Sequence, residues 1–168
     1  MSELAPDEQV GYHMKEASIT RYFQRDHDRL DALFQQFQHA TKTDPDKGRD
    51  CFQEFKSGLE RHIAWEEDIL FPRFEEKTGM RGTGPTEVMR MEHRQIKQLL
   101  EAIRQGLQQG TASDSDEAAL VEILHAHNQK EEQILYPAID ELLTDQDRLE
   151  VFARMARFYC SDSPTEPR

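Results

Sequence analysis

One short motif of histidine and glutamate occurs twice in this chain, and its two copies start 65 residues apart. Residues 62–72 read HIAWEEDILFP, and residues 127–137 read HNQKEEQILYP. In each copy a histidine is followed four residues later by a glutamate. The paired residues are His62 and Glu66 in the first copy, and His127 and Glu131 in the second. Imidazole nitrogens and carboxylate oxygens are common ligands of divalent metal ions, so the repeated pair indicates a metal site.

Each copy is preceded by a lone histidine that directly follows an acidic residue. The two dipeptides are Asp26-His27 and Glu92-His93, and their histidines lie 66 residues apart, close to the offset of the motif. The chain therefore looks like two related halves, each contributing one lone histidine and one histidine–glutamate pair. Four imidazoles and two carboxylates make a plausible ligand set for two metal ions.

The elements that must position these residues are predicted to be helices. Strand signals are almost absent, and apolar residues recur at spacings of three and four. The pattern predicts helices over residues 18–40, 47–77, 86–107 and 117–143, with a shorter fifth helix over 145–159. We expect an all-α, up-down-up-down four-helix bundle with Thr86 capping the third helix. Pro72 and Pro137 fall inside helices at corresponding places and should kink both.

The expected domain is single and spans residues 1–168, with its core bundle at about 18–143 and irregular ends at 1–15 and 160–168. On a helix, residues four apart share a face, so His62 projects with Glu66 and His127 with Glu131. Apolar residues share those faces; Glu131, for example, belongs to a stripe with Leu124, Ile134 and Leu135. A buried carboxylate is very costly unless it is paired or bound to metal, which favours the metal interpretation.

A single histidine on an apolar face is more often an ordinary core residue than a ligand. The same pattern on four successive helices argues against that explanation. Imidazole with bridging carboxylate suits iron, and manganese less well, whereas structural zinc prefers a closed tetrahedral set. The chain contains no His-Glu-x-x-His, which disfavours a metalloprotease. A ferritin-like di-iron site needs two Glu-x-x-His pairs, and only Glu122 with His125 fits.

Charge and hydropathy limit the partners that we expect. The chain has 21 basic and 33 acidic residues and a net charge of -12. This balance argues against nucleic acid or an anionic membrane as the main partner, because both are polyanions. No apolar run approaches the roughly 20 residues of a membrane span, and the first residues do not resemble a signal peptide. A cytoplasmic location is the default expectation.

The order of these residues resembles the hemerythrin-like (HHE cation-binding) family over roughly residues 18 to 143. The Leu-Phe-Pro and Leu-Tyr-Pro endings of the two motifs add to the resemblance. It implies a non-haem centre of two iron ions joined by carboxylates. One iron would be held by His27 and His62 and the other by His93 and His127, with Glu66 and Glu131 as bridges.

Two departures from the oxygen-carrying hemerythrins bear on function. Those proteins have a fifth histidine where this chain has Met89, and they place the last carboxylate where this chain has Glu132. The first repeat favours Glu131 over Glu132 as the second bridge. The chain is also similar to the bundle domain of di-iron proteins that repair damaged iron–sulfur clusters.

The functional hypothesis is a binding protein for oxygen or a related small ligand such as nitric oxide or peroxide, serving sensing, storage or protection. An alternative is a stress-response enzyme or repair protein that acts on peroxide, nitric oxide or iron–sulfur clusters. A third option is a helical interaction module without a tightly bound metal. The protein partner and the oligomeric state stay open at this stage.

Overall fold

In the computed structural model, which describes residues 18–111 and 113–161, all regular secondary structure is helical. This confirms the all-α class. The elements are α2 (Ile19–Thr41), α3 (Pro45–Trp65), η1 (Glu66–Leu70), α4 (Phe71–Thr78), α5 (Pro85–Gln109), α6 (Asp114–Lys130), η2 (Glu131–Leu135), α7 (Tyr136–Leu142) and α8 (Asp145–Ser161). Of the irregular ends expected at 1–15 and 160–168, residues 1–15 and 162–168 lie outside the described residues, whereas residues 160 and 161 belong to α8, so that helix extends further than expected.

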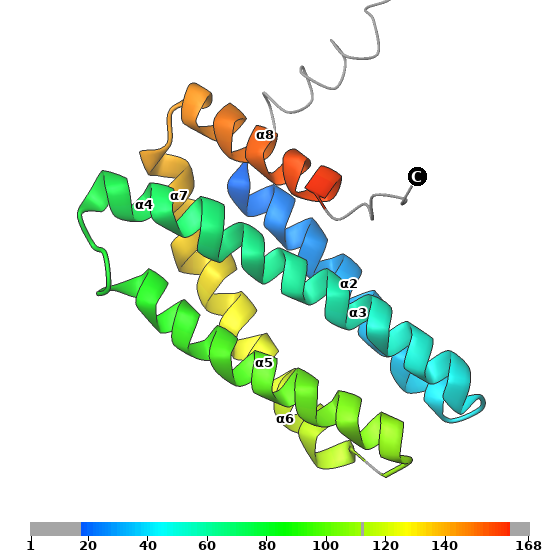
Figure 1. Cartoon of the computed structure of the whole chain (residues 1–168). Helices are drawn as coiled ribbons and strands as arrows, with labels where there is room; N and C mark the ends of the chain where they lie inside the picture. Colours follow the sequence, from blue (N-terminus) through cyan, green and yellow to red (C-terminus); the bar gives the residue numbers. More distant parts are fainter. Residues whose placement is uncertain (1–17, 112, 162–168) are drawn as a thin grey trace, which may run out of the picture.

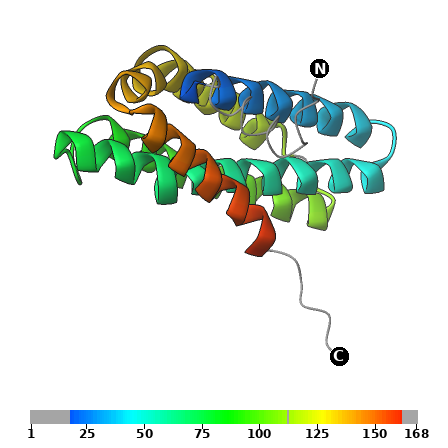
Figure 2. The ribbon, with the colours of Figure 1, turned by 90° about the horizontal axis from the view of Figure 1, so that it is seen from above.

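The long helices lie side by side as a bundle (Figure 1). Helices α3 and α4 continue one another through η1, and α6 and α7 do so through η2. Helix α2 packs against α3 and α7, and α5 packs against α6. Helix α8 runs obliquely across the bundle and contacts η1 (Figure 2). Among the described helices, none combines the length and the apolar character that a membrane crossing requires.

Helix α6 begins at Asp114, three residues earlier than expected, and two other helix starts differ from the sequence prediction for local reasons. Helix α3 begins at Pro45, two residues earlier than expected, because the Asp44 side chain accepts the free N–H groups of the first turn and proline fits the first helical position. Helix α5 begins at Pro85 after Gly84, so the prediction that Thr86 caps this helix was wrong. The Thr86 hydroxyl is buried and instead donates a hydrogen bond to Glu75 at 2.9 Å.

The two prolines inside helices are accommodated by a π-helical turn in front of each. In η1 the N–H of Phe71 bonds the carbonyl of Glu66, and in η2 the N–H of Tyr136 bonds the carbonyl of Glu131. Each proline then occupies the first turn of the next helix, where its missing N–H leaves no gap in the hydrogen bonding. Single π-helical turns occur often at functional sites, and both turns here begin at a glutamate of the repeated motif.

The core consists of two apolar clusters with a polar layer between them. One cluster surrounds Phe23 and Tyr136 and includes residues of α8, and the other surrounds Phe37 and Phe55. On α2, His27 lies between Phe23 of the first cluster and Leu30 of the second. The repeated histidines and glutamates therefore form a layer with apolar packing on both sides.

Ile134 breaks the repeat and corrects one sequence expectation. We expected it in the core, but it is 65% exposed, whereas Ile69, at the same place in the first copy, is 1% exposed. Ile69 belongs to the cluster that contains Val151, Phe152 and Met155 of α8. The repeat pattern alone does not reveal this difference, because the burial of Ile69 depends on a helix outside the repeat.

This difference predicts unequal costs for matched truncations. Ile69→Ala should lower the free energy of unfolding by about 2–5 kcal/mol, the usual range for a large-to-small change in a packed core. Ile134→Ala should change it by less than about 0.5 kcal/mol, as exposed substitutions do. Urea denaturation of both variants provides the measurement, and similar losses in the two would contradict the placement of α8.

Candidate metal centre

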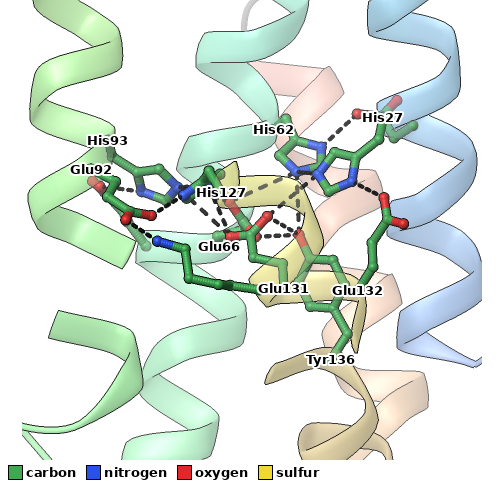
Figure 3. Close-up of polar contacts among 12 residues, drawn as sticks. His27, His62, Glu66, Glu92, His93, His127, Glu131, Glu132 and Tyr136 are labelled. Atoms are coloured by element: carbon green, nitrogen blue, oxygen red, sulfur yellow. Dashed lines mark hydrogen bonds and ion pairs between the residues drawn. The ribbon is translucent and has the colours of Figure 1, made fainter. Parts of the chain in front are cut away.

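The structure brings the six sequence-predicted ligands together in one buried layer (Figure 3). Each of the six residues is between 0% and 4% exposed. The residues come from four helical rods: His27 from α2, His62 and Glu66 from α3 and η1, His93 from α5, and His127 and Glu131 from α6 and η2. A layer of six ionisable groups at this depth requires internal partners for every polar atom.

The four histidines face one another as two pairs. The Nε2 atoms of His27 and His62 lie 3.1 Å apart, and those of His93 and His127 lie 3.2 Å apart. Each pair joins the lone histidine of one half to the motif histidine of the same half. The sequence resemblance implied the same two pairs.

Behind each histidine, a carboxylate lies within hydrogen-bonding distance of the outer ring nitrogen, Nδ1. The distances are 2.8 Å for His62 with Asp26, 2.6 Å for His27 with Glu132, 2.8 Å for His93 with Glu67, and 2.8 Å for His127 with Glu92. When Nδ1 donates its hydrogen to a carboxylate, Nε2 keeps its lone pair for a ligand in the centre. The four carboxylates therefore aim all four histidines inward.

Sequence reasoning missed this outer ring, although its signal was present. Asp26 and Glu92 directly precede the lone histidines, and Glu67 and Glu132 directly follow the paired glutamates. The first two bind a motif histidine of their own half, whereas Glu67 and Glu132 bind the lone histidine of the other half. The outer ring thus obeys the repeat symmetry and links the two halves.

Three of the outer carboxylates also contact a basic side chain. Arg29 pairs with Asp26 at 2.8 Å, Lys97 with Glu67 at 3.3 Å, and Lys130 with Glu92. Burial opposes ionisation of Asp26, but its hydrogen bonds to His62 and Arg29 prevail and lower its pKa to about 2. The carboxylate of Asp26 behind His62 is therefore a charged acceptor at neutral pH.

The two central glutamates meet the histidine pairs differently. Glu131 has one oxygen 3.1 Å from Nε2 of His127 and the other 3.4 Å from Nε2 of His27. Glu66 has a single oxygen, Oε2, that lies 3.2 Å from Nε2 of His93 and 3.7 Å from Nε2 of His62. Both carboxylates lie between the pairs, the position of a group shared by two ions.

The charges in the layer perturb its titration strongly. Burial lowers the pKa of His27 and of His93, but the hydrogen bonds and charges of the neighbouring glutamates outweigh burial and raise both values to about 9. Burial likewise opposes ionisation of Glu131, yet His127 and His27 hold the pKa of its carboxyl well below the usual range. The centre strongly favours positive charge next to the two carboxylates.

Two buried oxygens decide whether a metal fits this donor set. Within the described part of the chain, Oε2 of Glu66 and Oε1 of Glu131 accept no hydrogen bond of good geometry, although Nε2 of His93 and of His127 lie 3.2 and 3.1 Å away. Ligand atoms gather in two groups, each within 4.8 Å: His27, His62 and Glu131, and Glu66, His93, His127 and Glu131. Cations placed in the two groups would bind the unpartnered oxygens and the inward nitrogen lone pairs, so the residues fit a pair of metal ions.

Glu132, the alternative to Glu131 in the motif, lies outside the centre. Its side chain is 28% exposed and lies within hydrogen-bonding distance of Nδ1 of His27, the ring nitrogen that faces away from the centre. The side chain of Glu131 is fully buried. Met89, which stands where oxygen carriers have a histidine, is 3% exposed and belongs to the apolar cluster beside the layer.

Tyr136 is a site residue that the sequence analysis did not single out. It is fully buried, and its phenol oxygen lies 2.5 Å from Oε1 of Glu66 and 2.9 Å from Oε2 of Glu131. Burial and the two carboxylates raise the pKa of the phenol well above its usual range, so it acts as a hydrogen-bond donor. The available signal was the phenol hydroxyl of Tyr136, at the position where the first copy has Phe71.

A cavity of about 430 Å³ reaches the layer at His27 and Glu132. Its other walls come from α2, α6 and Phe55, and they include the polar side chains of Asp28, Asp31, Gln35, Gln38, His125, Asn128 and Gln129. This cavity therefore approaches the histidine pair of the first half.

Comparison with known proteins identifies the family. The sequence profile of the hemerythrin HHE cation-binding domain matches residues 18–157, and the chain therefore belongs to that family. No solved structure matches the chain significantly.

Three curated relatives are similar to it. An iron-sulfur cluster repair protein, YtfE, of Edwardsiella ictaluri is 38% identical over 92 residues, which are 51% of this chain and 42% of the relative. A DNA nickase of Nostoc is 26% identical over 136 residues, 81% of this chain and 37% of the relative. An uncharacterised hemerythrin-like protein of Schizosaccharomyces pombe is 29% identical over 149 residues, 85% of this chain and 71% of the relative. The chain thus spans less than half the length of the first two.

The outer carboxylates provide a prediction about metal affinity. Glu132→Ala should weaken metal binding about 10–100-fold, the usual effect of removing the partner that orients a histidine ligand. Glu131→Ala should abolish binding of two ions, because both groups of ligand atoms include this residue. Titration calorimetry with a divalent metal measures both effects, with the exposed Glu122→Ala as the control. Equal losses at Glu131 and Glu132 would contradict the placement of Glu132 outside the centre.

Proposed function

We propose that this protein holds two non-haem iron ions in the buried layer and binds a small ligand there. His27 and His62 would hold one iron, His93 and His127 the other, and Glu66 and Glu131 would serve both. The observation that carries the proposal is the pair of unpartnered buried oxygens between the two inward-facing histidine pairs. The up-down-up-down order of the four rods is part of the same proposal.

Iron is favoured over other metals by the donor set. The centre offers imidazoles and carboxylates, within a family defined by cation binding. Structural zinc sites are usually closed and tetrahedral and often contain thiolate. When bound, a pair of iron ions would supply two redox-active centres with positions open to oxygen, nitric oxide or peroxide.

The protein's own residues would orient the ions and limit access to them. The four outer carboxylates fix the ring orientations, and the apolar clusters on both sides exclude bulk water. Small molecules would approach through the cavity between α2 and α6, which ends at His27 and Glu132. Reversible ligand binding, for sensing, storage or protection, is favoured because the polar groups described beside the six ligands are already engaged. The outer carboxylates hold the histidines, and Tyr136 donates to the central carboxylates.

A second candidate function is the supply of iron to damaged iron–sulfur clusters. It is favoured by the similarity to an iron-sulfur cluster repair protein over about half of this chain. Both candidate functions would use the same six ligands, held in place by the same outer carboxylates. The outer ring is therefore compatible with either function.

The first test is the metal content of matched variants. Protein purified without added metal should contain about two irons per chain. Glu66→Ala should lose both, because a shared carboxylate serves both ions, whereas His27→Ala should keep partial occupancy. Elemental analysis of the three proteins measures this, and full iron content in Glu66→Ala would contradict the assignment.

The second test separates the two candidate functions. If the protein is a ligand-binding module, oxygen added to the reduced protein should give a stable spectral change that reverses when oxygen is removed. If it is a repair protein, iron should instead leave for a partner protein with damaged clusters and restore that partner's activity. Rapid irreversible oxidation, with no reversible step, would count against the binding function.

A further inference from the structure

Residue type follows the two-fold repeat in the inner and outer rings, with one exception at the aromatic position before each proline. Histidine matches histidine, glutamate matches glutamate, and an acidic residue matches an acidic residue throughout the inner and outer rings. The exception is Tyr136, which stands where the first half has Phe71. Only the hydroxyl distinguishes the two side chains, so any difference between the halves at this position comes from one oxygen atom.

The two aromatic rings contact the layer in different ways. Phe71 stacks face to face on His93, with ring centroids 5.9 Å apart and an interplanar angle of 5°. Tyr136 lies tilted against His27, with centroids 6.0 Å apart, and its hydroxyl points between the two central carboxylates (Figure 3). The hydroxyl is also 3.5 Å from Nε2 of His62. The polar contact therefore falls on the side of His27 and His62.

Each central carboxylate has one oxygen engaged by this hydroxyl and one that is not. For Glu66 the engaged oxygen is Oε1, and the histidines of both pairs face its other oxygen, Oε2. For Glu131 the engaged oxygen is Oε2, which also faces His27, while Oε1 faces His127. A hydrogen bond to a carboxylate oxygen withdraws electron density from it, so that oxygen becomes a weaker ligand.

We propose that Tyr136 is a positioning residue that makes the two metal positions chemically different. By holding Oε1 of Glu66, the hydroxyl leaves Oε2 as the oxygen that Glu66 presents to the histidine pairs. By sharing Oε2 of Glu131 with His27, it weakens the ligand field on the His27 side. The position beside His93 and His127 faces a ring without a hydroxyl, and the two oxygens directed to it, Oε2 of Glu66 and Oε1 of Glu131, are not the ones that Tyr136 engages. This inference rests on the proposed di-iron function.

Mössbauer spectroscopy of the diferrous protein tests this inference, because it reports the environment of each iron separately. The wild type should show two quadrupole doublets of equal area. Tyr136→Phe removes the distinguishing oxygen and should bring the two doublets together. Phe71→Tyr places a hydroxyl in each half and should also reduce their separation. Tyr22→Phe removes a hydroxyl from the same apolar cluster, outside the layer, and should leave the wild-type spectrum unchanged.

The outcomes separate this inference from the proposed function. Two irons in Tyr136→Phe with doublets unchanged from wild type would overturn the role of Tyr136. If that variant does not hold iron, unchanged doublets in Phe71→Tyr would overturn it equally. Fewer than two irons in the wild type would instead contradict the proposed function, and the inference with it.

Discussion

Two glutamates with no exposed surface sit at the centre of this bundle, and their burial constrains everything around them. An uncompensated carboxylate in a protein interior costs several kcal/mol, so Glu66 and Glu131 require cationic partners from every side. Four imidazoles face these glutamates. Within the described residues, one oxygen of each glutamate still accepts no hydrogen bond. Helix positions, the outer ring and the apolar clusters can all be understood as consequences of this requirement.

The helices satisfy the requirement by linking the two halves through side chains. Glu67 reaches His93, and Glu132 reaches His27, so each motif orients a histidine of the other half. A π-helical turn begins at each central glutamate and brings Phe71 or Tyr136 against the layer. The same turns place Pro72 and Pro137 where their missing donors are tolerated. Substitutions in either motif should therefore affect both histidine pairs.

Much of this arrangement could be predicted from spacing alone. The i, i+4 pairs, the lone histidines and the apolar periodicity gave the helical class, the family resemblance and the residues that meet in the layer. The outer carboxylates were harder to predict, because choosing between Glu131 and Glu132 depends on the rotation of the helix about its axis. Ile134 was misplaced because its burial depends on cover from outside the repeat. Tyr136 was overlooked because aromatic residues near a proline are usually core residues.

The central claim is that two iron ions lie between the histidine pairs and share the central glutamates. The most direct measurement is anomalous X-ray diffraction at the iron absorption edge, from crystals of protein purified without added metal. Our account predicts two anomalous peaks per chain, one beside Nε2 of His27 and His62 and one beside Nε2 of His93 and His127. A single peak, or an ion bound by Glu132 in place of Glu131, would contradict it.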